Sequence, residues 1–134
     1  MTYAMDTNII SYLLKKNVHI QKYMTESMNN GFEFVMLPIV YYEILRWLIE
    51  KESPLVQIEF NLMCEEMPLI TVTKSVWDKA AELYVFSRTI GKTINSDADL
   101  LIASICLVND ITLITNNTRH FKHIDGLKLI SWRD

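Results

Sequence analysis

The sequence predicts an α/β fold in which a mostly parallel sheet of four or five strands lies between layers of helices. Short β-rich segments alternate with longer helical segments along the chain, which is typical of such folds. The 134 residues form one domain, since single domains commonly contain ~100–150 residues. Only three glycines and three prolines interrupt the chain, which favours helices as the dominant elements.

Five short segments are expected to form the strands, and the last of them is an edge strand. Each is an apolar or β-branched run with polar or turn residues at its ends, a pattern that favours buried strands. The expected strands cover residues 3–5, 32–37, 69–72, 111–114 and 127–130.

Six longer segments are expected to form helices, because apolar residues recur in them at helical spacing. Pro38 follows the second strand and is well placed to open a helix, while Ser53-Pro54 separates the third helix from the fourth. The expected helices cover residues 7–16, 18–30, 39–52, the stretch from that break to about 67, 75–91 and 97–109. In the helix over 75–91 the side chains expected to face inward are Val76, Ala80, Leu83 and either Val85 or Phe86.

Composition and charge exclude several classes of protein. Half of the residues are apolar and 22% are charged, which excludes a disordered tail. The net charge of −3 excludes a polycation that binds nucleic acid by bulk charge, although a local basic rim remains compatible. The N-terminus lacks a signal-peptide pattern, and the longest apolar runs fall short of the ~20 residues of a membrane span. We therefore expect a soluble, cytoplasmic protein with no membrane contact.

Polar residues at the junctions between strands and helices are the candidate site residues, because ligands of open parallel sheets bind there. Four such places occur in the chain. They are Asp6 after the first strand, Glu43 early in the apolar helix 39–52, Asp97 and Asp99 at the start of helix 97–109, and the segment 115–121.

Each place also has a purely structural interpretation. Asp6, and either Asp97 or Asp99, could serve only as a helix N-cap. Glu43 could form a salt bridge with Arg46, three residues further along the helix. The asparagine-rich segment after the fourth strand could be an ordinary polar turn.

Carboxylates from several junctions would meet at one edge of the sheet. Like charges in a partly dry site repel one another unless a cation neutralises them. Oxygen ligands favour Mg²⁺ or Mn²⁺. Zinc is disfavoured because His120 and His123 have no cysteine or third histidine nearby in the sequence. The chain also lacks a glycine-rich phosphate loop and a Gly-x-Ser-x-Gly motif.

In this order, the four junctions resemble the PIN-domain ribonucleases, above all the VapC-type toxins of bacterial type II toxin–antitoxin systems. The likeness covers about residues 3 to 132 and implies a three-layer α/β/α PIN-like fold, with residues 1–134 as a single PIN domain. The matching motifs are Met5-Asp6-Thr7-Asn8-Ile9-Ile10-Ser11-Tyr12-Leu13, Ile39-Val40-Tyr41-Tyr42-Glu43-Ile44-Leu45, residues 91–103 with Asn95-Ser96-Asp97-Ala98-Asp99, and Leu113-Ile114-Thr115-Asn116-Asn117-Thr118-Arg119-His120-Phe121, followed by Gly126 and Trp132.

The resemblance implies a metal-dependent endoribonuclease that uses Mg²⁺ or Mn²⁺ and cleaves RNA, with tRNA or rRNA as the expected substrate. Asp6, Glu43 and Asp99 match the metal-binding carboxylates of the family, and Asp97 matches a further acid. Glu43 is also a candidate to accept a proton from the attacking water. Asn117 stands where many PIN domains carry a fourth acid, which makes tight binding of a second metal doubtful.

Further residues are expected to support the carboxylates or to contact RNA. Thr7, Asn8, Thr115, Asn116 and Asn117 are candidates for either role. The RNA backbone would be held by Arg119, His120, Lys122, Lys92 and Arg46, although Arg119 and Lys122 could simply be solvated and Arg46 could instead pair with Glu43 or with an acidic group of a partner.

The resemblance also implies protein partners. We expect a homodimer bound by a cognate VapB-like antitoxin in a toxin–antitoxin hetero-oligomer. Five aromatic or methionine side chains could line an apolar groove for the antitoxin, or they could be ordinary core residues. They are Tyr41, Tyr42, Trp47, Phe60 and Met63.

Two other functions remain open. A phosphate-accepting receiver domain also gathers acids at strand ends, but it requires a lysine after the last strand that has no match near Thr115. A degenerate PIN domain would bind RNA or protein without cleaving it, and Asn117 is the residue that keeps this alternative open.

Overall fold

The computed structural model describes residues 1–91 and 96–133. Within these ranges the strands are β1 (Thr2–Met5), β2 (Glu33–Val35), β3 (Ile111–Ile114) and β4 (Leu129–Ile130). The helices are α1 (Thr7–Leu14), α2 (Val18–Asn29), α3 (Pro38–Lys51), α4 (Pro54–Glu66), α5 (Lys74–Thr89) and α6 (Asp97–Asn109), with a short 3₁₀ helix over Thr118–His120.

The four strands form one parallel sheet in the order β2-β1-β3-β4. The chain leaves β1 to form β2 on one side and later forms β3 on the other side of β1. This reversal of direction between β1 and β3 is a topological switch point, where the carboxyl ends of the strands leave a crevice for ligands. The expected α/β fold with a parallel sheet is confirmed.

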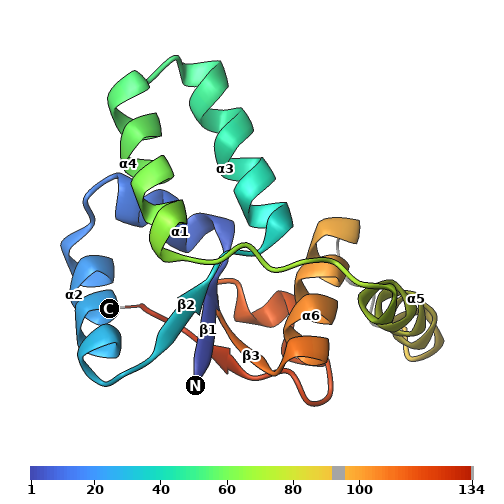
Figure 1. Ribbon diagram of the computed structural model, residues 1–134. Coiled ribbons are helices and arrows are strands. Elements are labelled where there is room, and N and C mark those ends of the chain that lie inside the picture. The colour runs from blue at the N-terminus through green and yellow to red at the C-terminus, as the bar shows by residue number, and fades with distance from the viewer. Residues whose placement is uncertain (92–95, 134) are drawn as a thin grey trace.

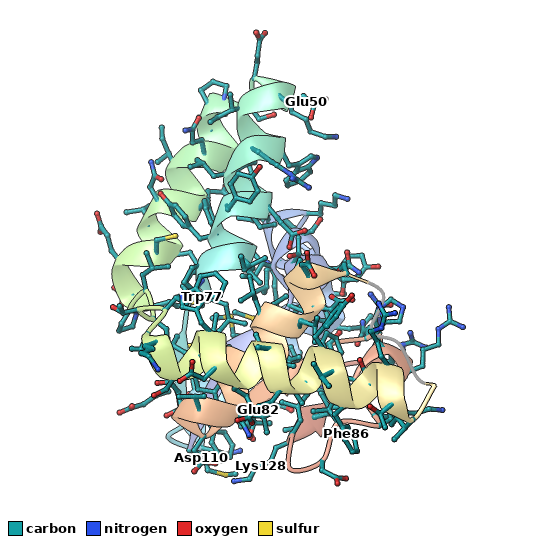
Figure 2. All side chains as sticks on the ribbon, turned by 90° about the vertical axis from the view of Figure 1, so that its right-hand side faces the viewer. Glu50, Trp77, Glu82, Phe86, Asp110 and Lys128 are labelled. Carbon is teal, nitrogen blue, oxygen red and sulfur yellow. The ribbon has the colours of Figure 1, made fainter. Side chains whose placement is uncertain are left out.

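Helices cover both faces of the sheet. Figure 1 shows α2 and α6 on opposite sides of the strands, with α5 outside α6 and the α3–α4 pair extending away from the sheet. On α2, the Tyr23 ring stacks on Trp132 at 5.9 Å, which holds the C-terminal segment against that layer. Figure 2 shows α5 across the front of the molecule, with its exposed residues Trp77, Glu82 and Phe86 labelled.

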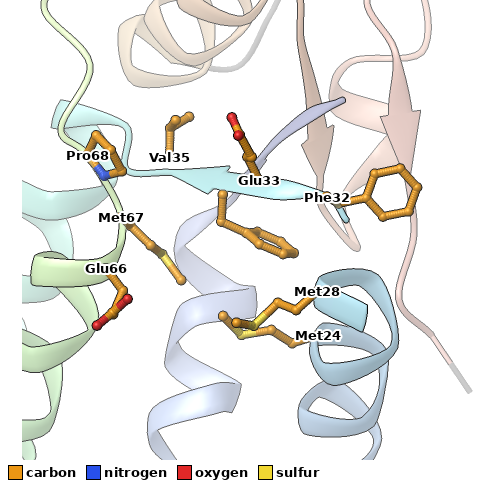
Figure 3. A pocket seen from close by; sticks show the side chains of 9 residues that line it. Met24, Met28, Phe32, Glu33, Val35, Glu66, Met67 and Pro68 are labelled. Carbon is orange, nitrogen blue, oxygen red and sulfur yellow. The ribbon is translucent and has the colours of Figure 1, made fainter. Parts of the chain in front are cut away.

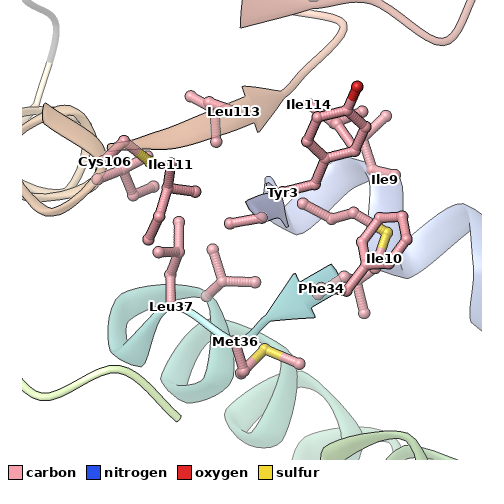
Figure 4. Packing of buried hydrophobic residues seen from close by; sticks show 14 of the residues in the cluster. Tyr3, Ile9, Ile10, Phe34, Met36, Leu37, Cys106, Ile111, Leu113 and Ile114 are labelled. Atoms are coloured by element: carbon pink, nitrogen blue, oxygen red, sulfur yellow. The ribbon is translucent and has the colours of Figure 1, made fainter. Parts of the chain in front are cut away.

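The core lies between the sheet and its helices. Figure 4 shows side chains from several elements converging on the strands. They are Ile9 and Ile10 of α1, Leu37 at the start of α3, and Cys106 of α6. This packing fixes the strand ends because the apolar face of each element has one place to be buried. Among the largest fully buried side chains are Phe60, Phe121, Met5, Met36, Ile44, Leu48, Ile102, Ile105 and Leu113.

The expected strand over 69–72 does not form. Only Leu69 makes a single bridge to Met36, and the Leu69 side chain is more than half exposed. The amide of Met36 donates to Pro68 O at 2.9 Å, and the amide of Ile70 donates to Met36 O at 3.0 Å. The segment is therefore an extended connection along the sheet edge, with too few ladder hydrogen bonds to make a strand.

The inward face of α5 also differs from the expectation at one position. Val85 and Phe86 are 63% and 49% exposed, whereas Ser87 is buried. Ser87 lies eleven residues after buried Val76, three helical turns on, and therefore shares its face. Its hydroxyl donates to Tyr84 O at 3.0 Å, so the helix itself satisfies this buried polar group.

No helix within residues 1–91 and 96–133 is long and apolar enough to cross a membrane.

Candidate active site

Asp6 lies at the centre of the candidate site, at the carboxyl end of β1. Its side chain is 8% exposed and caps α1, because its Oδ1 accepts a hydrogen bond from Thr7 N at 2.8 Å. Its Oδ2 accepts from the Thr115 hydroxyl at 2.8 Å. Asp6 N also donates to Ile114 O at 2.9 Å, which ties this residue to the end of β3. The N-cap interpretation of Asp6 is thus correct but incomplete.

Thr115 and Asn117 support Asp6 from the segment after β3. Thr115 is buried, and its backbone amide donates to Ile130 O at 3.0 Å. The amide of Asn117 donates to the Thr115 hydroxyl oxygen at 3.0 Å. This chain of hydrogen bonds directs the hydroxyl proton of Thr115 toward the Asp6 carboxylate.

Glu43 reaches the site from the second turn of α3. The Thr7 hydroxyl donates to Glu43 Oε1 at 2.8 Å, so one threonine at the start of α1 contacts both carboxylates, Asp6 through its amide and Glu43 through its hydroxyl. Among the residues described, no ion pair joins Glu43 to Arg46; the Arg46 guanidinium lies over the Tyr42 ring, 5.1 Å from its centroid. The salt-bridge interpretation of Glu43 is therefore not supported.

Asp99 is the third carboxylate and lies in the first turn of α6. Ser96 is the N-cap of this helix, since its hydroxyl oxygen accepts from Asp99 N at 3.1 Å. Asp99 is consequently not needed as the cap, and its half-buried side chain places Oδ2 3.5 Å from His120 Nδ1. The Ser-x-x-Asp spacing over 96–99, a pattern typical of helix starts, is a signal from which this cap could have been predicted.

The charges of these groups act on one another. Burial raises the pKa of Asp6; the Thr115 and Thr7 hydrogen bonds oppose the rise, and the charge of Asp99 adds to it. Burial also raises the pKa of Asp99, with His120 opposing the rise and the charge of Glu43 adding to it. Asp6, Asp99 and Glu43 therefore belong to one electrostatic neighbourhood in which negative charge is disfavoured.

The donor chemistry of this neighbourhood fits a hard divalent cation. Three carboxylates would supply oxygen ligands, and a cation would favour their charged forms, which burial and, to a smaller extent, neighbouring negative charge disfavour at Asp6 and Asp99. Burial and the charge of Asp6 raise the pKa of the Cys106 thiol to about 12, so this thiol is protonated in the metal-free protein. Within the described part of the chain, no three or more acidic, histidine or cysteine side chains lie close enough together to hold a metal ion as they stand.

Several expected site residues lie outside this group. Asp97 is exposed and lines a hollow between α5 and α6 with Trp77 and Tyr84. Asn8 is exposed on α1. Lys92 lies outside the described residues.

A small polar pocket of about 290 Å³ adjoins the site at the segment after β3. It is lined by Asn116, Asn117, Thr118, Arg119 and Arg133. The Asn116 carbonyl oxygen accepts from the Arg133 guanidinium, and its side-chain oxygen accepts from Trp132 N at 3.2 Å. Arg133 is not predicted at this pocket from the sequence. It lies there because β4 runs parallel to β3, which brings the residues that follow the two strands together.

Another hollow lies away from the carboxylates. Figure 3 shows it at the outer edge of β2, where Met24 and Met28 of α2 face Met67. Its volume is about 420 Å³, and no candidate site residue lines it.

The residues considered for an antitoxin groove have different environments. Phe60 is fully buried and stacks on Tyr41 at 5.7 Å, so these two rings belong to the core. Tyr42 is 57% exposed, while Trp47 and Met63 are half-buried.

The chain is similar to known proteins over almost its whole length. The family model described as PIN domain matches residues 3–127. Ribonuclease VapC2 of Rickettsia felis is 27% identical over 133 residues, which are 98% of each chain. In the crystal structure of VapBC2 from Rickettsia felis bound to a DNA fragment from its promoter, one chain matches with a TM-score of 0.89 and 26% identity, over 99% of this chain and 100% of that one. VapBC-1 from nontypeable Haemophilus influenzae matches with a TM-score of 0.83 and 25% identity over 98% of both chains.

Proposed function

Because the chain belongs to the PIN domain family, we propose that it is an endoribonuclease toxin that hydrolyses RNA phosphodiester bonds with Mg²⁺ or Mn²⁺. The observation that carries the proposal is geometric: Thr7 contacts both Asp6 and Glu43 at the switch point of the sheet, and Asp99 enters from the start of α6 with His120 3.5 Å away. The similarity to Ribonuclease VapC2 over 98% of both chains supports the same activity.

Asp6, Glu43 and Asp99 would hold the cation. A divalent cation among them would supply Lewis acidity and would neutralise the negative charge that develops during phosphodiester hydrolysis. The backbone amide of Asn117 donates to the Thr115 hydroxyl oxygen. The Asn117 side chain is neutral, so it adds no charge for a second cation. Asp97 would act only at the outer margin of the site, because it faces the α5–α6 hollow.

The residues of the chain itself position these groups. Thr7 orients Glu43 and Asp6, and Thr115 orients the other oxygen of Asp6. Glu43 is the proposed proton acceptor for the attacking water, and the hydrogen bond that its Oε1 accepts from the Thr7 hydroxyl at 2.8 Å would fix its position. Arg119 and His120 would bind the phosphate backbone next to Asp99, with Asn116 holding the segment in place.

A protein partner is part of the proposal. The matched chains occur in complexes named VapBC, which supports neutralisation of this chain by a VapB-like antitoxin. We also expect a homodimer within a toxin–antitoxin hetero-oligomer, acting in the cytoplasm on tRNA or rRNA. Asn8 would contact RNA at the exposed start of α1.

The test is cleavage of purified tRNA and rRNA by the wild-type protein with Mg²⁺ or Mn²⁺. We expect cleavage by the wild type, and at least a hundredfold slower cleavage by Asp6→Ala and Asp99→Ala, because each removes a charge needed at the site. Asp78→Ala is the matched control, since Asp78 is an exposed aspartate of α5 that pairs with Lys74 at 2.9 Å. Equal cleavage by the wild type and both site variants would reject the site. Binding of RNA without cleavage by any variant would favour the degenerate PIN domain.

A further inference from the structure

A pair of side chains on α3 borders the candidate site without belonging to it. Tyr42 directly precedes Glu43, and Arg46 follows one turn later. Successive residues of a helix are about 100° apart around its axis, so these two side chains form a stripe beside the face that carries Glu43. Glu43 itself is turned toward α1 by the hydrogen bond from the Thr7 hydroxyl at 2.8 Å. The stripe therefore lies at the rim of the carboxylate group.

The pair is arranged as a flat, positively charged surface. The Arg46 guanidinium lies 5.1 Å from the centroid of the Tyr42 ring, a cation–π contact that orders both side chains. Tyr42 nevertheless remains 57% exposed, and Arg46 is also exposed. An ordered aromatic ring with an open face costs little further entropy when another planar group stacks on it.

More positive charge continues along the same helix. Trp47 is four residues after Glu43 and thus lies one turn further on the same face. The ammonium groups of Lys15 and Lys51 lie 5.4 Å and 5.1 Å from the centroid of its ring. A second aromatic group with cationic neighbours therefore follows Tyr42 and Arg46 away from the carboxylates.

We propose that Tyr42 and Arg46 form a stacking platform for an unpaired base of the RNA, next to the phosphate that is cleaved, with Trp47, Lys15 and Lys51 binding the strand beyond it. The inference rests on the proposed function, because it takes RNA as the molecule that enters the site. It names the substrate class as single-stranded or loop RNA, since bases in a duplex are already stacked on their neighbours. Stacking tolerates any base, so the platform selects unpaired structure and not sequence.

The experiment measures RNA binding in EDTA, where cleavage does not interfere. A short unpaired RNA carries 2-aminopurine, whose fluorescence falls when it stacks on an aromatic ring. We expect quenching by the wild type and a roughly 5- to 100-fold weaker affinity for Tyr42→Ala, from the known range of about 1–3 kcal/mol for one stacked base. Tyr42→Phe keeps the aromatic face and retains the quenching, whereas Tyr42→Leu keeps apolar bulk and loses it.

Tyr84→Ala is the matched control. Tyr84 is 45% exposed on α5 and also has an arginine over its ring, since Arg88 lies 5.5 Å from the ring centroid. Unlike Tyr42, it does not border Glu43. We expect Tyr84→Ala to bind RNA as the wild type does. Equal losses for Tyr42→Ala and Tyr84→Ala, or unchanged quenching in Tyr42→Leu, would overturn the platform. A fully base-paired RNA that depends on Tyr42 as strongly as the unpaired RNA would overturn the substrate class.

Cleavage assays on the same proteins separate this inference from the proposed function. Absence of cleavage by the wild type, together with binding that depends on Tyr42, would reject the nuclease and support the platform. Cleavage by the wild type with no dependence of RNA binding on Tyr42 would support the nuclease and reject the platform, which would leave this surface to a protein partner.

Discussion

Asp6 combines a stabilising role with a destabilising one. Its carboxylate caps α1 and receives the Thr115 hydroxyl proton, both of which favour the charged form. Burial and the nearby charge of Asp99 disfavour that form, and the net effect is a raised pKa. The charged form of Asp6 is thus less favourable in the folded protein than in the unfolded chain, as expected for a group kept for function.

Asp6→Asn should stabilise the metal-free protein at neutral and higher pH. The amide can still accept from Thr7 N and can donate to the Thr115 hydroxyl, but it carries no buried charge. Because the folded pKa of Asp6 is raised, the folded state binds more protons than the unfolded state, and wild-type stability falls as pH rises from the ordinary pKa of an aspartate through the raised pKa of Asp6. We expect a gain of roughly 0.5–2 kcal/mol at pH 8.

The measurement is urea unfolding in EDTA over a series of pH values. The gain of Asp6→Asn should shrink as pH falls through the folded pKa of Asp6, where the wild-type carboxyl becomes neutral as well. A variant that is less stable than the wild type at high pH would contradict the assigned balance between burial and hydrogen bonding.

Single residues show what sequence reasoning can and cannot reach. Asp6 and Asp99 are predictable as candidates because they stand where a strand ends or a helix begins. The Thr7–Glu43 hydrogen bond joins residues 36 positions apart, and no local pattern predicts it. The choice between Arg46 and α1 as the partner of Glu43 depends on the direction in which α3 presents its second turn, and this is a property of packing.

At the scale of elements, α6 illustrates how a helix start prepares a site. Ser96 takes the capping hydrogen bond, so Asp99 remains free to face His120 and the other carboxylates. The acidic first turn also interacts favourably with the helix dipole. The cap therefore fixes the position of the Asp99 backbone without using its side chain.

Ser96→Ala should destabilise the protein by about 1 kcal/mol, the usual cost of losing an N-cap side chain. The reason is that Asp99 N would lose its acceptor at 3.1 Å. Urea unfolding should show a lower midpoint with an unchanged slope. Ser96→Thr retains a hydroxyl acceptor and should stay close to the wild type; an equal loss in both variants would mean that the capping bond is not what stabilises α6.

The elements that sequence predicted best are those whose signals are local. Helix Asp97–Asn109 and strand Ile111–Ile114 have the expected bounds, because a cap, a continuous apolar run and a turn define them. The expected strand at 69–72 failed because a strand needs a partner, and there the neighbouring chain offers only Met36. On α5, hydrophobicity favours Phe86 over Ser87 as the buried residue, whereas the structure buries Ser87 and exposes Phe86.

At the scale of the whole molecule, the site depends on topology. Asp6 and Thr115 are 109 positions apart in sequence, yet they share a hydrogen bond because β1 and β3 are neighbours in the sheet. The alternation of strands and helices predicts a parallel sheet, but not the order β2-β1-β3-β4 that creates the switch point. Neither the residues nor the resemblance to a family predicted this strand order.

If the cation binds only the assembled site, it must stabilise the whole fold. Binding to the native state alone adds RT ln(1 + [L]/Kd), or about 1.4 kcal/mol at ten times Kd. For a chain of 134 residues we expect Mg²⁺ or Mn²⁺ to raise Tm by roughly 3–5 °C at that concentration. Thermal unfolding of the wild type, at constant ionic strength, measures this shift.

The carboxylate variants decide where that stabilisation originates. Asp99→Asn should remove the metal-dependent rise in Tm, since it deletes one oxygen ligand and one of the charges that a cation offsets. Asp110→Asn should retain the rise, because Asp110 is exposed, pairs with Lys128 and occupies a left-handed backbone position that asparagine also tolerates. If the cation raised the Tm of Asp99→Asn as much as that of the wild type, the cation would be bound elsewhere. Metal binding would then not explain why the fold keeps three mutually repelling carboxylates close together.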